Sequence, residues 1–285
     1  MMRSMFAAIS GLKAHQTMLD VTAADIANVN TLGYKSSRMT FRDSLAQLQR
    51  GGAAPGIGQG GTNAAQVGLG SQIGSIDNMM TGGALETTGN PLDVAISGEG
   101  WLRVGPANGG TVTAPGVPTA ISYTRAGNFT TNDQGFLTTA DGDYVVGQNV
   151  TAGGTPGTTD TLIQIPTSAT NVSIGQDGSV TYQPAGGGTR VNAGYLSLAK
   201  FANQGALERR GDNTWGAGPN SGPELVGTPG VNNYGVSVSG AVEMSNVDLA
   251  SEFTNMITAQ RGFQANSRII STADQMLQDL VNLIR

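Results

Sequence analysis

Two acidic residues close to a tryptophan are the arrangement in this chain that most resembles a catalytic site. Asp93 and Glu99 lie on either side of Ser97 and just before Trp101. Glycosidases use two carboxyl groups, one as an acid and the other as a nucleophile or base. The spacing is not specific, because a chain with 20 acidic residues contains many such pairs. A carbohydrate-active enzyme is therefore only a minor alternative.

Other motifs that could bind a cofactor or a metal are weak. Residues 68–74 are rich in glycine but depart from the spacing of a dinucleotide-binding loop. The Asp-Gly pairs at 141–142 and 177–178 lack the twelve-residue, glutamate-terminated pattern of a calcium loop. The chain has no cysteine and one histidine, His15, which argues against a zinc site and a Ser-His-Asp triad. We expect no cofactor, no metal and no enzymatic activity.

The composition favours a folded protein with many turns. The 285 residues are 38% hydrophobic, which is enough for a core, while charged residues make up 12%, about half the usual share. The formal charge of −5 argues against a groove for nucleic acid. No apolar run is long enough to span a membrane, and no signal-peptide cleavage site follows the N-terminus. These rules predict a cytosolic protein, unless an export route leaves the N-terminus uncleaved.

Both ends of the chain carry apolar residues at alternating steps of four and three, the spacing of a coiled-coil seam. At the N-terminal end the seam positions are Met5, Ile9, Leu12, Gln16, Leu19, Ala23 and Ile26. At the C-terminal end they are Leu249, Phe253, Met256, Gln260, Phe263, Ser267, Ile270, Asp274, Leu277, Val281 and Ile284. All 11 prolines and 40 of the 43 glycines lie in residues 51–242, so neither end is interrupted. We expect two long helices that pair with each other.

Three alternate positions of the C-terminal seam are polar: Gln260, Ser267 and Asp274. They can indicate imperfect packing, or they can mark register and assembly in a helix that has several partners. We favour the second interpretation, because the seam residues between them are apolar. One stripe of the helix would then contact the N-terminal helix, and the others would contact neighbouring subunits. The segment 245–248 predicts the start of this helix, with Ser245 or Asn246 as the cap and Asp248 reaching back.

Between the two ends, short runs of β-branched and aromatic residues bounded by Gly, Asn and Asp indicate strands. The expected strands are residues 94–96, 101–104, 121–123, 135–138, 144–146, 162–165, 171–174, 179–182 and 193–201. Hairpin turns are expected at 133–135, 141–142 and 177–178. Before this region, Phe41, Leu45 and Leu48 have helical spacing, and the glycine-rich residues 51–61 have the composition of a flexible linker.

These patterns predict an α+β protein, in which the N- and C-terminal helices form a discontinuous coiled-coil domain and the rest is a mainly antiparallel β domain. The expected parts are an N-terminal helix in 1–33, a connecting segment with the glycine-rich linker in 34–67, a β-rich outer domain in 68–243 and a C-terminal helix in 244–285.

Motifs at both ends and in the middle of the chain resemble those of the axial proteins of the bacterial flagellum, which form its rod and hook. The N-terminal motifs are Ile9-Ser-Gly-Leu12 and the run from Asp25 to Lys35. The central motifs are the run from Gly89 to Trp101 and the run from Tyr123 to Phe129. The C-terminal motifs are the run from Glu243 to Leu249 and the run from Ala259 to Gln264. Many members of the family have two asparagines where this chain has Ala24 and Asp25.

The resemblance implies a structural subunit that assembles with copies of itself into a helical tube. Within the family the chain looks most like the short hook proteins of Gram-positive bacteria. The expected function is therefore the hook, a flexible joint that transmits torque between rod and filament, and the alternative is the distal rod, a drive shaft. The implied partners are further copies of the chain, the distal rod protein, the hook–filament junction protein, the hook cap and the flagellar type III export apparatus, with no nucleic acid and no membrane insertion.

The resemblance also implies export through that apparatus with an uncleaved N-terminus, and so a location in the hook and basal body. Phe41 and Leu45 resemble the Phe-x-x-x-apolar motif that early flagellar substrates present to the export gate. A helix face that packs on the core explains the same two residues equally well. A third class of function, an adhesin-like binding module, would show affinity for a ligand without polymerisation.

Overall fold

The computed structural model describes residues 2–56, 58, 60–107, 110–111, 114–151 and 154–283. Two compact units make up the chain. Unit 1 consists of Met1–Ala27, Ser37–Met79 and Val247–Arg285, and unit 2 consists of Asn28–Ser36 and Met80–Asn246. These limits differ from the expected parts, since residues 37–79 group with the helices and residues 28–36 group with the β-rich unit.

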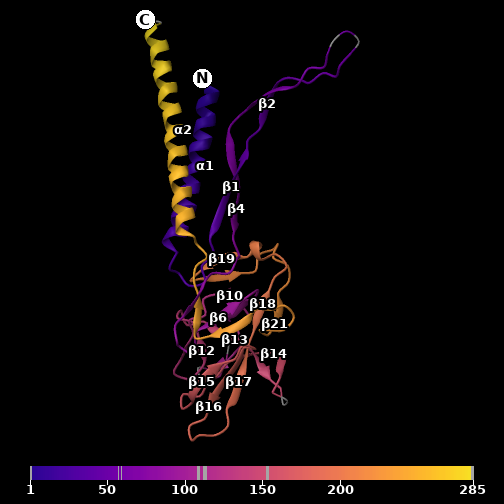
Figure 1. The fold of residues 1–285 in the computed structure, drawn as a ribbon, viewed down its shortest axis with the longest axis vertical. Coiled ribbons are helices and arrows are strands. Elements are labelled where there is room, and N and C mark those ends of the chain that lie inside the picture. Colours follow the sequence, from indigo (N-terminus) through magenta and orange to yellow (C-terminus); the bar gives the residue numbers. More distant parts are fainter. Residues whose placement is uncertain are drawn as a thin grey trace. The chain divides into compact units, whose positions relative to one another are not determined.

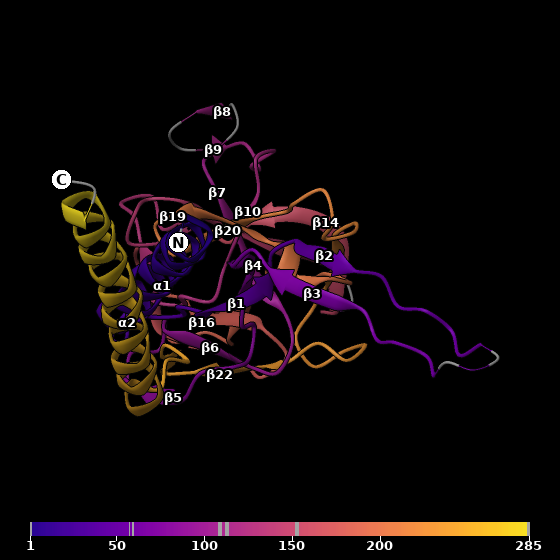
Figure 2. The ribbon, with the colours of Figure 1, turned by 90° about the horizontal axis from the view of Figure 1, so that it is seen from above.

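Unit 1 contains the two predicted helices. α1 spans Met2–Ala27, α2 spans Leu249–Leu283, and the two lie side by side in both views (Figures 1 and 2). They run antiparallel, because a Cβ added at Gly11 would lie 2.9 Å from Asn266 Nδ2, and one added at Gly262 would lie 2.5 Å from His15 Nε2. No helix is long and apolar enough to cross a membrane, as far as the structure describes the chain.

The helix contact surface is shifted by one residue from the predicted seam. On α1 the buried residues are Ala8, Gly11, Ala14, Thr22 and Asp25, whereas the predicted Met5, Ile9, Leu12, Leu19 and Ile26 are half-buried. On α2 Ala259 and Ala273 are buried, Met256, Phe263 and Ile270 are half-buried, and Leu249, Phe253, Gln260, Leu277 and Val281 are exposed. Ile284 lies outside the described residues. Small side chains allow the two backbones to approach closely, which moves the bulky residues to the flanks of the contact.

The N-terminal cap of α2 is Asp248 rather than Ser245 or Asn246. The Asp248 Oδ1 atom accepts a hydrogen bond from the Ala250 N–H at 3.0 Å, as a capping side chain does. The helix begins at Leu249, directly after Asp248, so Ser245 and Asn246 are too far from its first free amides. The Asn246 side chain bonds to unit 2 instead, as described below.

The rest of unit 1 consists of two antiparallel ribbons. β1 (Ser37–Asp43) pairs with β4 (Ser71–Asn78), and β2 (Ala46–Arg50) pairs with β3 (Ala65–Gly68). The expected helical face through Phe41, Leu45 and Leu48 is therefore wrong, because three residues at helical spacing are weaker than pairing with strands further along the chain. The glycine-rich residues 51–61 connect β2 to β3, and Ala53 pairs with Thr62. They close a hairpin rather than link two domains, with positions 57 and 59 outside the described residues.

The regular secondary structure described in unit 2 is almost entirely β, and its strand pairs are antiparallel. Its strands are β5 (Leu85–Thr87), β6 (Val94–Ser97), β7 (Trp101–Gly105), β8 (Gly110–Thr111), β9 (Ala114–Pro115), β10 (Ser122–Thr124), β11 (Thr130–Thr131), β12 (Leu137–Thr138), β13 (Tyr144–Val150), β14 (Pro156–Leu162), β15 (Thr170–Ile174), β16 (Ser179–Gln183), β17 (Val191–Leu196), β18 (Leu198–Lys200), β19 (Glu208–Gly211), β20 (Thr214–Gly216), β21 (Leu225–Gly227), β22 (Val236–Ser239) and β23 (Ala241–Glu243). One short 3₁₀ turn spans Gln204–Ala206. The largest sheet has the order β15-β16-β17-β13-β7-β10-β20-β19.

Most of the expected strands and all three expected turns are confirmed. Gly135, Gly142 and Gly178 have φ values of 83°, 91° and 77°, a conformation that glycine adopts without a steric penalty. The expected strand 162–165 is the main exception, because β14 ends at Leu162. Ile163 and Ile165 beyond it are buried in the core, and Gln164 between them forms only an isolated β-bridge with Phe136.

Two hydrophobic clusters form the core of unit 2. The larger contains Val94, Ile96, Leu102, Val104, Phe129, Leu137, Val145, Ile163, Ile165, Ile174, Val180, Leu196 and Leu198. The smaller contains Trp101, Tyr123, Ala199, Phe201, Leu207 and Trp215. Both tryptophans of the chain belong to the smaller cluster, with ring centroids 5.7 Å apart. Together these units confirm the α+β class and the mainly antiparallel β domain.

Candidate assembly surface and motif cluster

The structure does not support the possible hydrolytic pair. The Asp93 carboxylate accepts hydrogen bonds from the Thr88 hydroxyl at 2.5 Å and from Asn90 Nδ2 at 3.0 Å, so it stabilises a turn. Glu99 is exposed and forms an ion pair with Lys200. Trp101 has no exposed surface and cannot hold a sugar. Among the described residues, no three His, Asp or Glu side chains form a group that could hold a metal ion.

Three charged residues from the three groups of motifs meet inside unit 2. Glu243 Oε1 lies 2.5 Å from Lys35 Nζ, and Glu243 Oε2 lies 3.0 Å from Arg125 Nη1. All three side chains are at most 4% exposed. Residues from the N-terminal, central and C-terminal motifs therefore form one buried ion cluster, which we call the motif cluster.

The motif cluster contains two positive charges and one negative charge, and backbone groups form several further hydrogen bonds with it, although the buried Arg125 Nε has no partner among the described residues. Lys35 Nζ donates to Thr81 O at 2.9 Å, and Arg125 Nη2 donates to Gly98 O at 2.8 Å. The Gly83 N–H donates to Glu243 Oε1 at 2.9 Å. A buried ion pair is tolerated only when such bonds replace the lost water, because each desolvated charge costs several kcal/mol.

The charges in the motif cluster change the titration of its members. Burial alone would raise the pKa of Glu243, but the positive charges of Arg125 and Lys35 outweigh it and lower the pKa. Burial lowers the pKa of Lys35, and the attraction of Glu243 only partly offsets that effect. The Glu243 carboxylate is thus held in its charged form.

The segment that follows α1 is held tightly in unit 2. Gly33 has a φ of 65°, and its N–H donates to Glu243 O at 2.7 Å. A Cβ at Gly33 would lie 2.6 Å from Ala126 N, so only glycine fits this position. Gly33 therefore lies against the chain next to Arg125.

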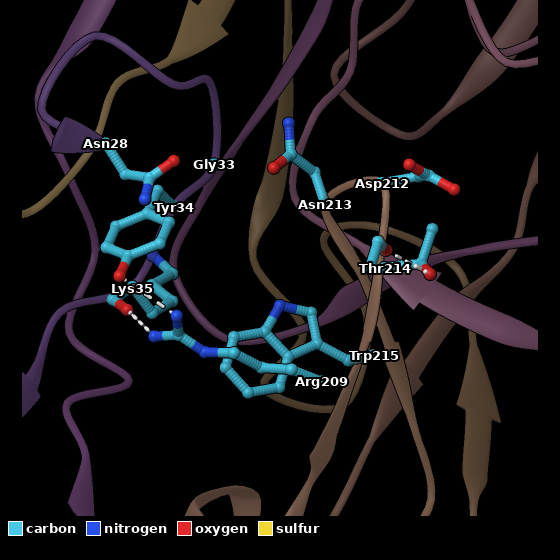
Figure 3. Close-up of a pocket in the computed structure, with 10 residues that line it drawn as sticks. Asn28, Gly33, Tyr34, Lys35, Arg209, Asp212, Asn213, Thr214 and Trp215 are labelled. Carbon is cyan, nitrogen blue, oxygen red and sulfur yellow. Dashed lines mark hydrogen bonds between the residues drawn. The ribbon is translucent and has the colours of Figure 1, made fainter. Parts of the chain in front are cut away.

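Tyr34 and Arg209 form the wall of a small pocket in the same unit (Figure 3). The Arg209 guanidinium lies 4.6 Å from the Tyr34 ring centroid and 5.1 Å from that of Trp215. It donates to the Tyr34 hydroxyl at 2.9 Å and to Lys35 O. The pocket has a volume of about 150 Å³. The guanidinium of Arg209, which lines the pocket, is bonded to Tyr34 and Lys35. Its contacts therefore help to fix residues 34–35.

The exposed apolar side chains of unit 1 are concentrated on its helices and ribbons. On α2 they are Leu249, Phe253, Ile257, Ile269, Met276, Leu277, Leu280, Val281 and Leu283. On the ribbons they include Phe41, Leu45, Leu48, Val67, Leu69, Ile73 and Ile76. Exposed apolar residues in this number are typical of a protein that contacts other proteins.

The end of α2 extends past its partner helix. Gly11 faces Asn266 and His15 faces Gly262, so the same register places Met2, where α1 starts, opposite Gln275. Every described residue from 274 onward is exposed. We call residues 276–283 the overhang. Its apolar residues are Met276, Leu277, Leu280, Val281 and Leu283.

The sequence patterns identified the helices but not the motif cluster. Among the predicted assembly residues, Met256, Phe263 and Ile270 contribute to the helix contact, whereas Leu249, Phe253, Leu277 and Val281 face outward. The assembly residues that the sequence predicts do not include Lys35, Arg125 or Glu243, although each lies within a motif. Charged residues make up only 12% of the chain, and their presence inside motifs is the signal that could have identified them.

Three family models match separate parts of the chain. Residues 5–35 match the family model described as flagella basal body rod protein. Residues 95–182 match the flagellar hook protein FlgE/F/G D1 domain, and residues 238–283 match the flagellar basal body rod FlgEFG protein C-terminal model. These three ranges contain Lys35, Arg125 and Glu243 respectively.

Individual relatives include both rod and hook proteins. The flagellar basal-body rod protein FlgG of Bacillus subtilis is 46% identical over 286 residues, which cover 100% of both chains. FlgG of Caulobacter vibrioides is 38% identical over 97% of both chains. The flagellar hook protein FlgE of Borreliella burgdorferi is 28% identical over 440 residues, which cover 99% of this chain and 100% of the hook protein.

Proposed function

Because the chain belongs to the flagellar rod and hook protein family, we propose that it is a distal rod subunit of the flagellar basal body. The observation that carries this proposal is the match of 46% identity to a basal-body rod protein, from end to end and with almost no length difference. In contrast, the alignment to the hook protein needs 440 positions for a chain of 285 residues, so that hook protein has a large insertion without a counterpart here. The distal rod, the alternative in the sequence analysis, is now favoured over the hook.

The proposed subunit acts as a mechanical part and not as a catalyst, in line with the structural character of its family. Copies of the chain assemble into a helical tube that serves as a drive shaft. The helix contact within one chain uses Ala8, Gly11 and Ala259, which leaves Phe253 and Ile257 free to contact neighbouring copies. Burial of apolar surface between copies contributes about 25 cal/mol per Å².

The overhang is the part of α2 that most needs a neighbouring copy. Asn266, Ile270 and Ala273 form the last part of the seam, and Leu277 and Leu280 continue it at steps of four and three. Within the chain nothing described covers these two residues, which are 36% and 46% exposed. A helix from another copy would extend the same contact. Ile284 has the spacing to take part, although it lies outside the described residues.

The proposed route to the rod is export through the flagellar type III apparatus. The export-gate candidates are Phe41, which lies on β1 and is 42% exposed, and Leu45, which lies between β1 and β2 and is 79% exposed. They do not lie on a helix, so the expected helix face does not account for their hydrophobicity, and contact between copies is the other explanation. The neighbours in the proposed position are further copies of the chain and, at one end, the hook.

The test of the proposal is the position of the subunit in isolated flagella. An epitope inserted after Gly187 should be tolerated, because the turn between β16 and β17 is exposed and no atom lies within 4 Å of a Cβ added at Gly186, Gly187 or Gly188. Immunogold electron microscopy of hook–basal bodies should place the label on the rod. Label along the curved external hook would overturn the rod proposal in favour of the hook.

A further inference from the structure

The chain passes between unit 1 and unit 2 four times, after residues 27, 36, 79 and 246. Three of these passages leave unit 2 through residues that contact one another. The Asn246 side chain bonds to the other two: its Oδ1 accepts from the Ser36 N–H at 2.7 Å, and its Nδ2 donates to Thr81 Oγ1 at 2.9 Å and to Thr81 O at 3.2 Å. One asparagine therefore links the ends of three passages.

The motif cluster links the same three segments a second time. Lys35 Nζ bonds to both Thr81 O and Glu243 Oε1. Glu243 in turn accepts from the Gly33 N–H through its backbone oxygen and from the Gly83 N–H through its carboxylate. Segments 33–36, 81–84 and 243–246 are thus bonded in every pairwise combination, by backbone and by side-chain groups.

We propose that Asn246, Lys35 and Glu243 form a clamp that opens only as a whole and fastens the three passages to one another in unit 2. Breaking one contact of the clamp leaves a buried charge without its partner. This costs much more than the loss of one exposed hydrogen bond. Hydrogen bonds that follow one another in a chain also strengthen one another in a water-poor interior. Each of the three segments is therefore held by hydrogen bonds to both of the others.

The clamp distributes tension, and this use rests on the proposed function in a drive shaft. A pull that enters unit 2 through one passage must break the bonds of all three segments together. Without the clamp, the same pull would break one or two hydrogen bonds at a time, as when a single strand is peeled from a sheet. A subunit that carries repeated torque needs bonds that resist the pull together.

Hydrogen–deuterium exchange on the purified full chain tests whether the clamp opens as a unit. Asn246→Ala removes the side-chain bonds to Ser36 and Thr81. A cooperative clamp predicts that the amides of Gly33 and Gly83, which bond to Glu243 and not to Asn246, also exchange about ten times faster, the effect of about one hydrogen bond. Asn203→Ala is the matched control, because Asn203 Nδ2 donates to Asn220 O elsewhere in unit 2. It should leave both amides unchanged.

Faster exchange at Ser36 alone, with Gly33 and Gly83 unchanged, would overturn the clamp. Asn246→Asp is the second variant: it keeps the acceptor for Ser36 but loses the donor to Thr81, and it should accelerate Gly33 and Gly83 in the same direction. Tryptophan emission verifies that unit 2 is folded in each variant, since Trp101 and Trp215 both lie in its core. The exchange measurement uses the purified chain and needs no polymer. Immunogold label on the hook would therefore refute the rod proposal without affecting the exchange result for the clamp.

Discussion

Lys35 and Glu243 are 208 positions apart in the sequence, and their side chains form a salt bridge of 2.5 Å with at most 1% of either exposed. Arg125 contacts the other oxygen of the same carboxylate. The ion pair therefore connects the segment after the first helix, the central β-structure and the segment before the last helix within unit 2. It gives a physical role to three motif residues that do not contribute to a hydrophobic core.

Removal of the carboxylate should destabilise unit 2 more than removal of the lysine. Glu243→Gln leaves two buried cations without an anion, and the cost of such an uncompensated charge is about 3–5 kcal/mol. Lys35→Met leaves the Glu243–Arg125 pair balanced and should cost less. Urea unfolding followed by tryptophan emission measures both values in unit 2, where the only two tryptophans lie. An equal or reversed order would mean that Arg125 does not balance Glu243.

Acid should weaken unit 2 through Glu243. Its pKa is lowered in the folded protein below the usual 4.5, so the unfolded chain binds a proton more readily. The stabilisation is complete above pH 4.5 and is lost as the pH falls through the lowered folded pKa. Asp143 acts in the opposite direction, because burial and the charges of Asp141 and Asp212 raise its pKa. The difference between wild type and Glu243→Gln in urea unfolding from pH 7 to pH 3 isolates Glu243: it should shrink with acid, and a constant difference would contradict the prediction.

The sequence predicts local patterns well and contacts between distant residues poorly. The two helices and the hairpin turns were predictable, because periodicity and Asp-Gly pairs act over a few residues. The seam was shifted by one residue, because small residues such as Gly11 and Ala259 do not count as hydrophobic in a heptad although they allow the closest approach. The strand through Phe41 could not be predicted locally, because it pairs with β4, about 30 residues further along the chain. The partnership of Lys35 with Glu243 spans most of the chain and has no local signal.

The close approach of the helices at Gly262 should not tolerate a large side chain. A Cβ there would lie 2.5 Å from the His15 ring, and the rest of a leucine has no room, so Gly262→Leu should separate α1 from α2. The control is Gly11→Ala, whose Cβ would meet only the end of the Asn266 side chain at 2.9 Å and which gains about 1 kcal/mol in helix propensity. Thermal loss of the circular dichroism signal at 222 nm should occur earlier for Gly262→Leu and change little for Gly11→Ala. Equal melting of the two variants would contradict the observed register.

The overhang should control polymerisation without affecting unit 2. Leu277→Asp and Leu280→Asp place a charge on the continued seam, where a neighbouring copy would have to bury it, and should abolish filament growth seen by electron microscopy. Gln278→Asp changes the same stretch at an exposed polar position and should assemble normally. All three variants should keep the tryptophan emission and urea midpoint of wild type. Assembly by the two leucine variants would show that copies do not contact each other through this seam.

The exposed position of Leu45 allows export to be tested separately from folding. Its side chain is 79% exposed, so Leu45→Ser removes little packing and should change the stability of the folded subunit by less than about 0.5 kcal/mol. If Phe41 and Leu45 are read by the export gate in the unfolded chain, the same variant should lower the secreted fraction several-fold, measured by immunoblot of the culture medium against the cell pellet. Leu48→Ser is the matched control, because Leu48 is 56% exposed on the neighbouring strand and lies outside the motif. Equal secretion of the two serine variants would mean that the hydrophobicity of Leu45 serves contacts between assembled subunits and not export.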